Sequence, residues 1–149
     1  MGVQLAKAKG AYVYATGSGE NEDFIKELGA DEFINYKQTN FEDVAKDVDV
    51  VLDTVGGDTQ TRSFQVLKKG GFLVSLVAPP SPELAEQYGV KAEMIQSGPN
   101  SELLEELAKF VENGKVKAHI EKIFPLSEIK EAHKLSESGH ARGKIVLEP

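Results

Sequence analysis

The chain has 149 residues, of which 40% are hydrophobic and 28% charged, a composition typical of one soluble domain with a hydrophobic core. It carries 24 acidic and 17 basic side chains without a run of Lys or Arg, which argues against nucleic-acid binding. The absence of cysteine excludes disulfides, cysteine metal ligands and thiol nucleophiles. No apolar stretch approaches the roughly 20 residues of a membrane helix and no signal-peptide pattern is present, so we expect a cytoplasmic protein without membrane contact.

Helical and strand patterns alternate through the N-terminal part of the chain. β-branched and aromatic residues favour strands, whereas glycine after an apolar segment and acidic residues before one mark the ends of helices. The predicted elements are a helix over residues 3–9, a strand over 11–16, a helix from the acidic residues 20–23 to Gly29, a strand over 32–36, and a helix over 40–46 capped by Asn40.

Residues 48–77 hold the most informative pattern of the chain. It consists of an apolar β-branched run at 50–52, a turn at 53–57, a helix at 58–67, a second turn at 69–71 and another apolar run at 72–74. This order predicts two buried parallel strands joined by a helix, a βαβ unit. Because ligands of open α/β sheets bind beyond the carboxyl ends of the strands, we expect residues 54–57 and 77–80 to form a binding edge.

The C-terminal part continues the alternation. We predict a short helix opening at Pro82, a strand over 91–96, a helix over 101–113 capped by Ser101, a strand over 116–124, a helix over 127–136 and a strand over 144–148. The helix over 101–113 has one apolar face, made by Leu103, Leu104, Leu107, Phe110 and Val111. Strands that alternate with helices of this length predict an α/β fold, a Rossmann-like doubly wound parallel sheet.

Five segments resemble one family when taken together, in order and at its spacing. They read VQLAKAKG at 3–10, ELGADEFINY at 27–36, DVVLDTVGG at 49–57, LKKGGFLVSL at 67–76 and SGHARGKIVL at 138–147. With them the chain resembles the medium-chain dehydrogenase/reductase superfamily (zinc-type alcohol dehydrogenase-like), particularly its quinone oxidoreductase-like branch. The resemblance implies a truncated dinucleotide-binding domain over 1–115 and a segment over 116–149 that packs with a GroES-like catalytic domain.

The same resemblance implies that the start of the cofactor domain is missing. A dinucleotide-binding fold begins with a strand and a glycine-rich turn before its first helix, whereas this chain begins within a helix. We therefore expect the C-terminal part of a longer enzyme. In the usual strand order the missing strand lies between the strands at 11–16 and 48–53. We expect those strands to pair directly, another segment to fill the gap, or a second chain to close the sheet in a homodimer.

The function implied by the resemblance is hydride transfer between a nicotinamide cofactor and a carbonyl, enone or quinone. The strand at 11–16 ends without an acidic residue before Glu20, which favours NADP, with NAD as the alternative. A lysine common in the family a few residues later is replaced, because Asn21 and Glu22 occupy that region. The cofactor-binding residues implied by the family are Thr16, Ser18, Tyr36, Thr54, Val55, Gly56, Val77, Ala78, Arg142 and Lys144.

No catalytic residue or metal site is predicted. Asp53 has no histidine or carboxylate that the sequence places beside it, and hydride transfer is the chemistry of the cofactor. The three histidines, at 119, 133 and 140, lack the spacing of metal ligands. We predict no turnover by the chain alone. Two alternatives are an S-adenosylmethionine-dependent methyltransferase and a non-catalytic nucleotide-binding or oligomerisation module.

Overall fold

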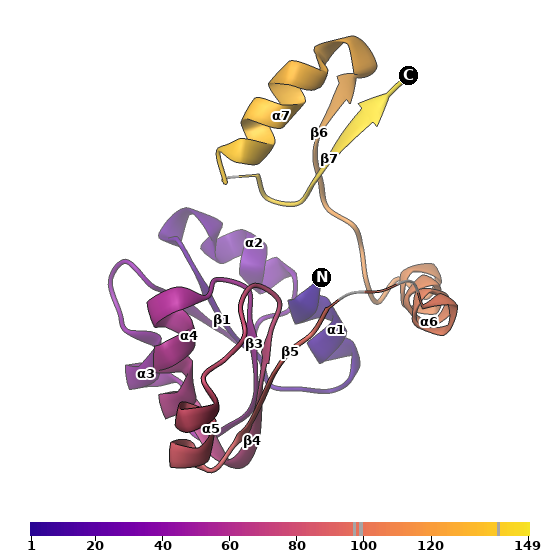
Figure 1. The fold of residues 1–149 in the computed structure, drawn as a ribbon. Helices are drawn as coiled ribbons and strands as arrows, with labels where there is room; N and C mark the ends of the chain where they lie inside the picture. The colour runs from indigo at the N-terminus through magenta and orange to yellow at the C-terminus, as the bar shows by residue number, and fades with distance from the viewer. Residues whose placement is uncertain (97, 99, 140) are drawn as a thin grey trace. The chain divides into compact units, whose positions relative to one another are not determined.

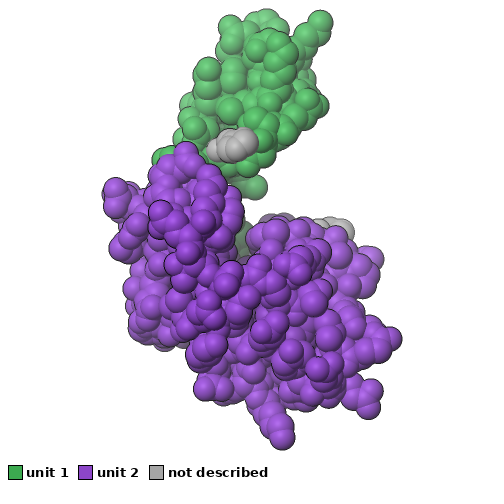
Figure 2. Space-filling model, turned by 90° about the vertical axis from the view of Figure 1, so that its left-hand side faces the viewer, with its two compact units in different colours: residues 1, 106–149 green, residues 2–105 purple. Residues whose placement is uncertain are grey.

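The computed structural model describes residues 1–96, 98, 100–139 and 141–149, and it divides into two compact units (Figures 1 and 2). The first is Gly2–Glu105, and the second comprises Glu106–Pro149 together with Met1. His140 lies outside the described residues. The domain boundary predicted after residue 115 stays a prediction.

The first unit alternates helices and parallel strands. Its elements are α1 (Gly2–Ala8), β1 (Tyr14–Gly17), η1 (Gly19–Asn21), α2 (Glu22–Glu27), β2 (Glu32–Asn35), α3 (Phe41–Val44), β3 (Val48–Asp53), α4 (Gly57–Ser63), η2 (Phe64–Val66), β4 (Leu67–Ser75), α5 (Pro82–Tyr88) and β5 (Lys91–Met94). β1 pairs with β2, and β4 pairs with both β3 and β5, always in parallel. The α/β class with parallel strands is therefore confirmed.

The strands of this unit form two separate sheets, β1–β2 and β3–β4–β5. Direct pairing of β1 with β3 was therefore a wrong prediction, and no strand among the described residues fills the position between them. Closure by a second chain stays a prediction. The two sheets nevertheless share a core, because buried Ile34 of β2 and Val66 of η2 belong to one apolar cluster against which Tyr14 and Val51 pack.

A polar contact also joins the halves of the first unit. The Arg62 guanidinium of α4 donates to both carboxylate oxygens of Glu42 in α3, at 2.7 and 2.6 Å. This two-pronged geometry fixes the orientation of both side chains. The Arg62 contact holds the pKa of the Glu42 carboxyl below its usual value, against the opposing effect of burial.

The βαβ unit departs from its predicted bounds. α4 ends at Ser63, a 3-10 turn follows, and β4 begins at Leu67, five residues earlier than the predicted run at 72–74. Val48 pairs with Leu67 but Val50 pairs with Phe72, so residues 68–71 bulge out of the ladder. The predicted turn at 69–71 is this bulge. The reason is burial: Leu67 and Leu73 are both buried in the cluster centred on Phe64, on the face covered by α5 (Figure 1).

Helix caps also differ from the sequence prediction. Pro82 begins α5 as predicted. Ser81, which was not predicted as a cap, caps this helix, because its Oγ accepts from the Leu84 N–H at 3.2 Å. Asn40 precedes α3, but its side chain makes no capping hydrogen bond and donates to Asp43 instead. Asn100, rather than Ser101, caps α6 (Ser101–Glu112), because its Oδ1 accepts from the Leu103 N–H at 3.0 Å.

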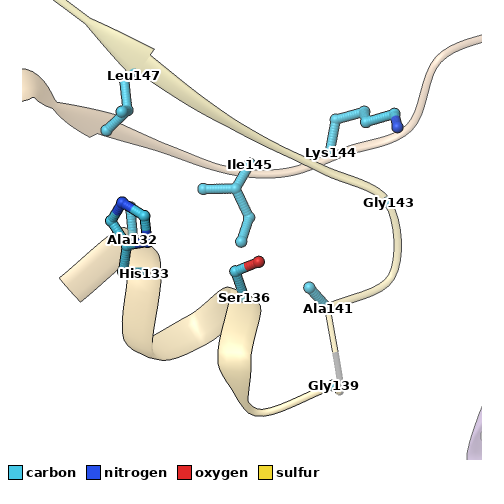
Figure 3. A pocket seen from close by; sticks show the side chains of 9 residues that line it. All are labelled: Ala132, His133, Ser136, Gly139, Ala141, Gly143, Lys144, Ile145 and Leu147. Atoms are coloured by element: carbon cyan, nitrogen blue, oxygen red, sulfur yellow. The ribbon is translucent and has the colours of Figure 1, made fainter. Parts of the chain in front are cut away.

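The second unit is a strand, a helix and a strand. β6 (Ile120–Pro125) pairs in parallel with β7 (Lys144–Glu148), and α7 (Ile129–Glu137) connects them after the turn η3 (Leu126–Glu128). Phe124 and Ala132 are buried here. Figure 3 shows an open hollow between α7 and β7, lined among others by His133, Ser136 and Lys144.

Candidate functional site

Two polar side chains end neighbouring strands at the edge that the sequence marks for binding. Asp53 closes β3 and Ser75 closes β4, and the two are paired in register. Both are buried, with 4% and 0% of their surface exposed. The Ser75 hydroxyl donates to Asp53 Oδ2 at 2.9 Å. A buried carboxylate thus lies directly beneath the loops that follow the two strands.

Gln60 of α4 completes this cluster. Its Nε2 lies 2.9 Å from Asp53 Oδ2, 3.1 Å from Ser75 Oγ and 3.0 Å from the carbonyl oxygen of Ala78. A side-chain amide has only two N–H groups, so these three contacts share them. Gln60 therefore links the helix to the ends of both strands and to the loop after β4. We call Asp53, Gln60 and Ser75 the strand-end cluster.

The strand-end cluster holds the backbone of both loops. Asp53 Oδ1 accepts from the N–H groups of Val55 and Gly56 at 3.0 and 2.8 Å. Ser75 Oγ lies 3.3 and 3.2 Å from the N–H groups of Val77 and Ala78. The predicted residues Thr54, Val55 and Gly56 are thereby brought together with Val77 and Ala78.

The charge of Asp53 is stabilised where it is buried. Burial disfavours the carboxylate, but the hydrogen bonds from Gly56, Val55, Gln60 and Ser75 outweigh it and hold the pKa of Asp53 below its usual value. All four donors are neutral. Among the residues that the structure describes, Asp53 forms no ion pair.

Gly56 brings the two loops into contact. Its backbone has φ 78° and ψ −167°, a region that is open essentially only to glycine. A Cβ atom built there would lie 3.1 Å from Cγ2 of Val77. The side chains beside it stay available, since Val55 is 67% and Val77 47% exposed. The loops therefore form one accessible surface above the strand-end cluster.

A second group of predicted residues gathers at the ends of β1 and β2. The Tyr36 N–H donates to the Gly17 carbonyl at 3.2 Å, which extends the pairing of the two strands by one step. Ser18 begins the turn η1, and its Oγ accepts from the Asn21 amide at 2.9 Å. Thr16 is exposed, and so is the Tyr36 ring. Thr16, Ser18 and Tyr36 are thus neighbours on one strand edge.

Sequence reasoning missed a basic residue here. The Lys37 ammonium lies 3.6 Å from the Glu20 carboxylate, and both side chains are largely exposed. The family resemblance implies a lysine a few residues after Ser18, whereas in this chain a lysine, Lys37, directly follows Tyr36. The sequence signal that could have identified Lys37 was its position just after the end of β2, the strand that pairs with β1. The strand-end cluster was also missed, and its signal was Asp53 followed seven residues later by a glutamine on a short helix.

The last two predicted residues belong to the second unit. Lys144 begins β7 and lines the hollow of Figure 3, and its N–H donates to the His119 carbonyl at 2.9 Å. Arg142 lies just before that strand and is exposed. Both residues belong to the unit Glu106–Pro149, and their role as cofactor contacts stays a prediction.

Two features are absent from the part of the chain that the structure describes. No group of three or more His, Cys, Asp or Glu side chains is arranged to hold a metal ion there. No helix within those residues combines the length and apolar character needed to cross a membrane.

Known proteins similar to the chain are dehydrogenases and oxidoreductases. The zinc-binding dehydrogenase family matches residues 28–147. Mouse "NAD(P)H oxidoreductase RTN4IP1, mitochondrial" is 35% identical over an alignment that includes 97% of this chain and 43% of the mouse protein. The Arabidopsis thaliana "NADPH-dependent alkenal/one oxidoreductase, chloroplastic" is 34% identical and covers 99% of this chain and 36% of that protein. The chain thus spans less than half the length of these relatives.

Solved structures give the same result. The quinone oxidoreductase of Coxiella burnetii superposes with a TM-score of 0.89 at 39% identity, over 99% of this chain and 48% of that chain. The Escherichia coli quinone oxidoreductase complexed with NADPH has a TM-score of 0.80 at 27% identity, over 99% of this chain and 52% of that chain. The chain therefore belongs to the zinc-binding dehydrogenase family of the medium-chain dehydrogenase/reductase superfamily, where it resembles the quinone oxidoreductases.

Proposed function

We propose that this chain binds a nicotinamide dinucleotide, NADPH in preference to NADH, as part of an oxidoreductase that transfers hydride to a carbonyl, enone or quinone. The observation that supports it best is the pair of loops after β3 and β4, which the strand-end cluster holds at the binding edge of a parallel sheet. The hydride chemistry belongs to the cofactor, and the protein supplies position and electrostatics.

The preference for NADPH rests on the ends of β1 and β2. An NAD site uses an acidic side chain to accept from the ribose 2′-hydroxyl, whereas an NADP site surrounds the 2′-phosphate with small or basic groups. Ser18 and Tyr36 provide hydroxyl groups at this edge, and Lys37 provides a cation beside them. Glu20 is an unfavourable neighbour in this arrangement, and its pairing with Lys37 would have to open for a phosphate to bind.

The nicotinamide half is assigned to Thr54, Val55, Gly56, Val77 and Ala78. Their loops fit a flat ring because Gly56 carries no side chain at the contact with Val77. Arg142 and Lys144 stay predictions as phosphate contacts, as does the cytoplasmic location. The names of the mouse and Arabidopsis relatives place those proteins in mitochondria and chloroplasts.

Binding of cofactor fragments to the purified 149-residue chain tests the proposal. Titrated into isotope-labelled protein, adenosine 2′,5′-bisphosphate should shift the backbone NMR signals of Ser18, Tyr36 and Lys37, and NADPH should bind more tightly than NADH. Lys37→Ala should weaken the bisphosphate at least about threefold at low salt, because it removes a cation that faces the phosphate. Lys91→Ala, which removes an exposed lysine on β5, is the matched control.

Two results would contradict the proposal, and a third would contradict only the expectation that this chain alone has no turnover. Equal affinity for NADH and NADPH would refute the NADP preference. Binding of S-adenosylmethionine without any nicotinamide nucleotide would favour the methyltransferase, against which family membership already argues. NADPH oxidation with a quinone by the 149-residue chain would refute the expectation that this chain alone has no turnover.

A further inference from the structure

The strand-end cluster turns the hydrogen-bond donors of both loops inward. The N–H groups of Val55 and Gly56 are directed to Asp53, and those of Val77 and Ala78 to Ser75. These donors are therefore occupied within the protein. A ligand on the outer side of the loops therefore meets the carbonyl side of each peptide group rather than its N–H.

The geometry of the peptide bond defines that carbonyl side. In a trans peptide the C=O points opposite to the N–H, and the structure contains no cis peptide among its described residues. The carbonyl groups of Thr54, Val55, Leu76 and Val77 share peptide units with the four inward N–H groups. Their oxygens consequently point away from the cluster. Val55 and Val77, in the same two loops, are 67% and 47% exposed.

The charge behind these carbonyls is not neutralised locally. Asp53 accepts only from neutral donors. The charged side chains of the adjoining helix α4 are Asp58, which is 81% exposed, and Arg62, whose guanidinium is bound by Glu42. A buried anion and four outward carbonyl dipoles therefore act in the same direction on whatever contacts the loops.

We propose that this surface binds the oxidised, positively charged nicotinamide ring more tightly than the reduced, neutral one. The inference rests on the proposed function and deepens it, because it assigns Asp53 a role toward the ring that Asp53 does not touch. Asp53 is a positioning residue with an electrostatic effect. By linkage, a surface that favours the oxidised ring makes bound reduced cofactor a better hydride donor.

The expected size follows from Coulomb's law. A ring in contact with the outer side of these loops lies about 7 Å from the carboxylate, one hydrogen bond plus one van der Waals contact away. At an effective dielectric constant of about 20 to 40, a unit charge at that distance changes the affinity by about sevenfold or more. We therefore expect a preference of at least about sevenfold for the oxidised ring.

The experiment uses the 149-residue chain and two small probes, nicotinamide mononucleotide and its dihydro form. Both lack the adenosine half, so their dissociation constants report on the β3–β4 loops alone. The wild-type chain should bind the oxidised probe at least about sevenfold more tightly. Asp53→Asn should remove most of this preference. Asp58→Asn, the same acid-to-amide change at an exposed site on α4, should leave the ratio within about twofold.

The ratio of the dissociation constants of the two probes separates an effect of the Asp53 charge from an effect of Asp53 on the shape of the loops. If Asp53→Asn weakens both probes equally and keeps the ratio, the carboxylate only shapes the loops and the proposal is overturned. Ser75→Ala keeps the carboxylate and loosens the loop after β4, so it should weaken both probes while the preference persists. If Ser75→Ala loses the preference for the oxidised probe, the proposal is also overturned. Should Asp53→Asn not fold, a wild-type chain that binds the reduced probe as tightly as the oxidised one is sufficient refutation.

Adenosine 2′,5′-bisphosphate in the same samples separates this inference from the proposed function. If the bisphosphate shifts the signals of Ser18 and Tyr36 while the mononucleotides show no difference, the further inference fails and the proposed function stands. If neither probe binds, both are overturned.

Discussion

The ends of β1–β2 and of β3–β4, which we propose as two halves of one binding edge, are built in opposite ways. At β3–β4 a buried cluster of side chains fixes the backbone, and the loops are held by hydrogen bonds of 2.8 to 3.3 Å. At β1–β2, Thr16 and the Tyr36 side chain are exposed, and the Lys37 ammonium lies 3.6 Å from the Glu20 carboxylate between two largely exposed side chains. Under the proposed function, the β3–β4 half would recognise the cofactor by shape and a fixed electric field, and the β1–β2 half by surface charges that salt can screen.

This contrast determines how each half responds to substitution. Changes in the β3–β4 half should affect stability and binding together, because the same buried groups do both. Changes in the β1–β2 half should affect binding alone and depend on ionic strength.

Asp53→Asn should give the largest effect. An asparagine can still accept from Val55 and Gly56, but its own amide would face the Gln60 amide, donor against donor. We expect a loss of about 3 kcal/mol in the free energy of unfolding at pH 7, measured by urea denaturation. Asp58→Asn, at the exposed start of α4, is the control and should cost little.

The loss of stability caused by Asp53→Asn should also depend on pH. The pKa of folded Asp53 is lowered, so its carboxylate stabilises the fold above its unfolded pKa of about 3.9. That contribution is lost as the pH falls through the folded pKa. The stability gap between wild type and Asp53→Asn should therefore be constant from about pH 5 to 7 and shrink below about pH 4. A gap that does not depend on pH would show that the charge of Asp53 contributes nothing to stability.

Gly56→Ala should give the second-largest loss of stability. The backbone at Gly56 lies in a region closed to alanine, and the added methyl would meet Val77 at 3.1 Å. We expect a cost of about 2 kcal/mol and a loss of more than about tenfold in nicotinamide mononucleotide affinity. Gly10→Ala is a matched control, since Gly10 also has positive φ but open space around it. Equal effects of both variants on affinity would disprove contact between the loops as the cause.

The sequence predicted much of the fold because apolar runs and turn residues act locally. The runs at 50–52 and 72–74 were found because β-branched apolar residues favour strands. The prediction that both strands are buried was wrong for β3, where Val50 and Leu52 are 59% and 50% exposed. The start of β4 was missed because residues 64–67 also fit a helix, and only packing of Phe64 and Leu67 against Leu73 decides otherwise. Asn40 and Ser101 were plausible caps by residue type, but capping depends on side-chain geometry that the sequence does not specify.

The sequence predicted those parts of the candidate site that lie directly after strand ends. The parallel sheet brings Thr54, Gly56 and Val77 together because strands of one direction end at one edge. Asp53, Gln60 and Ser75 are far apart in sequence, and their meeting depends on the register of β3 with β4 and on the pitch of α4. Gly17 and Tyr36 likewise meet only through the register of β1 with β2, which is why Lys37 escaped notice.

Gln60→Ala should have a smaller effect than either earlier change. It removes one donor from Asp53 and Ser75 and leaves the Ala78 carbonyl without its partner, while the four backbone contacts of the loops remain. We expect a cost of about 1 to 2 kcal/mol by thermal or urea unfolding. Thr61→Val, which removes a weak exposed hydrogen bond on the same helix, is the control. An effect as large as that of Asp53→Asn would mean that Gln60, rather than Asp53, is the main support of the loops.

Glu20→Gln should give the smallest effect, and in the opposite direction. Removing the carboxylate frees Lys37 from its only ion pair among the described residues and removes a negative charge beside the proposed 2′-phosphate site. We expect adenosine 2′,5′-bisphosphate to bind about twofold to threefold more tightly at low salt, with no change in unfolding temperature. The gain should disappear at about 0.5 M salt and in the Lys37→Ala background. A gain that survives high salt or the loss of Lys37 would show that Glu20 acts through backbone shape, and the contrast between the two halves of the edge would then fail.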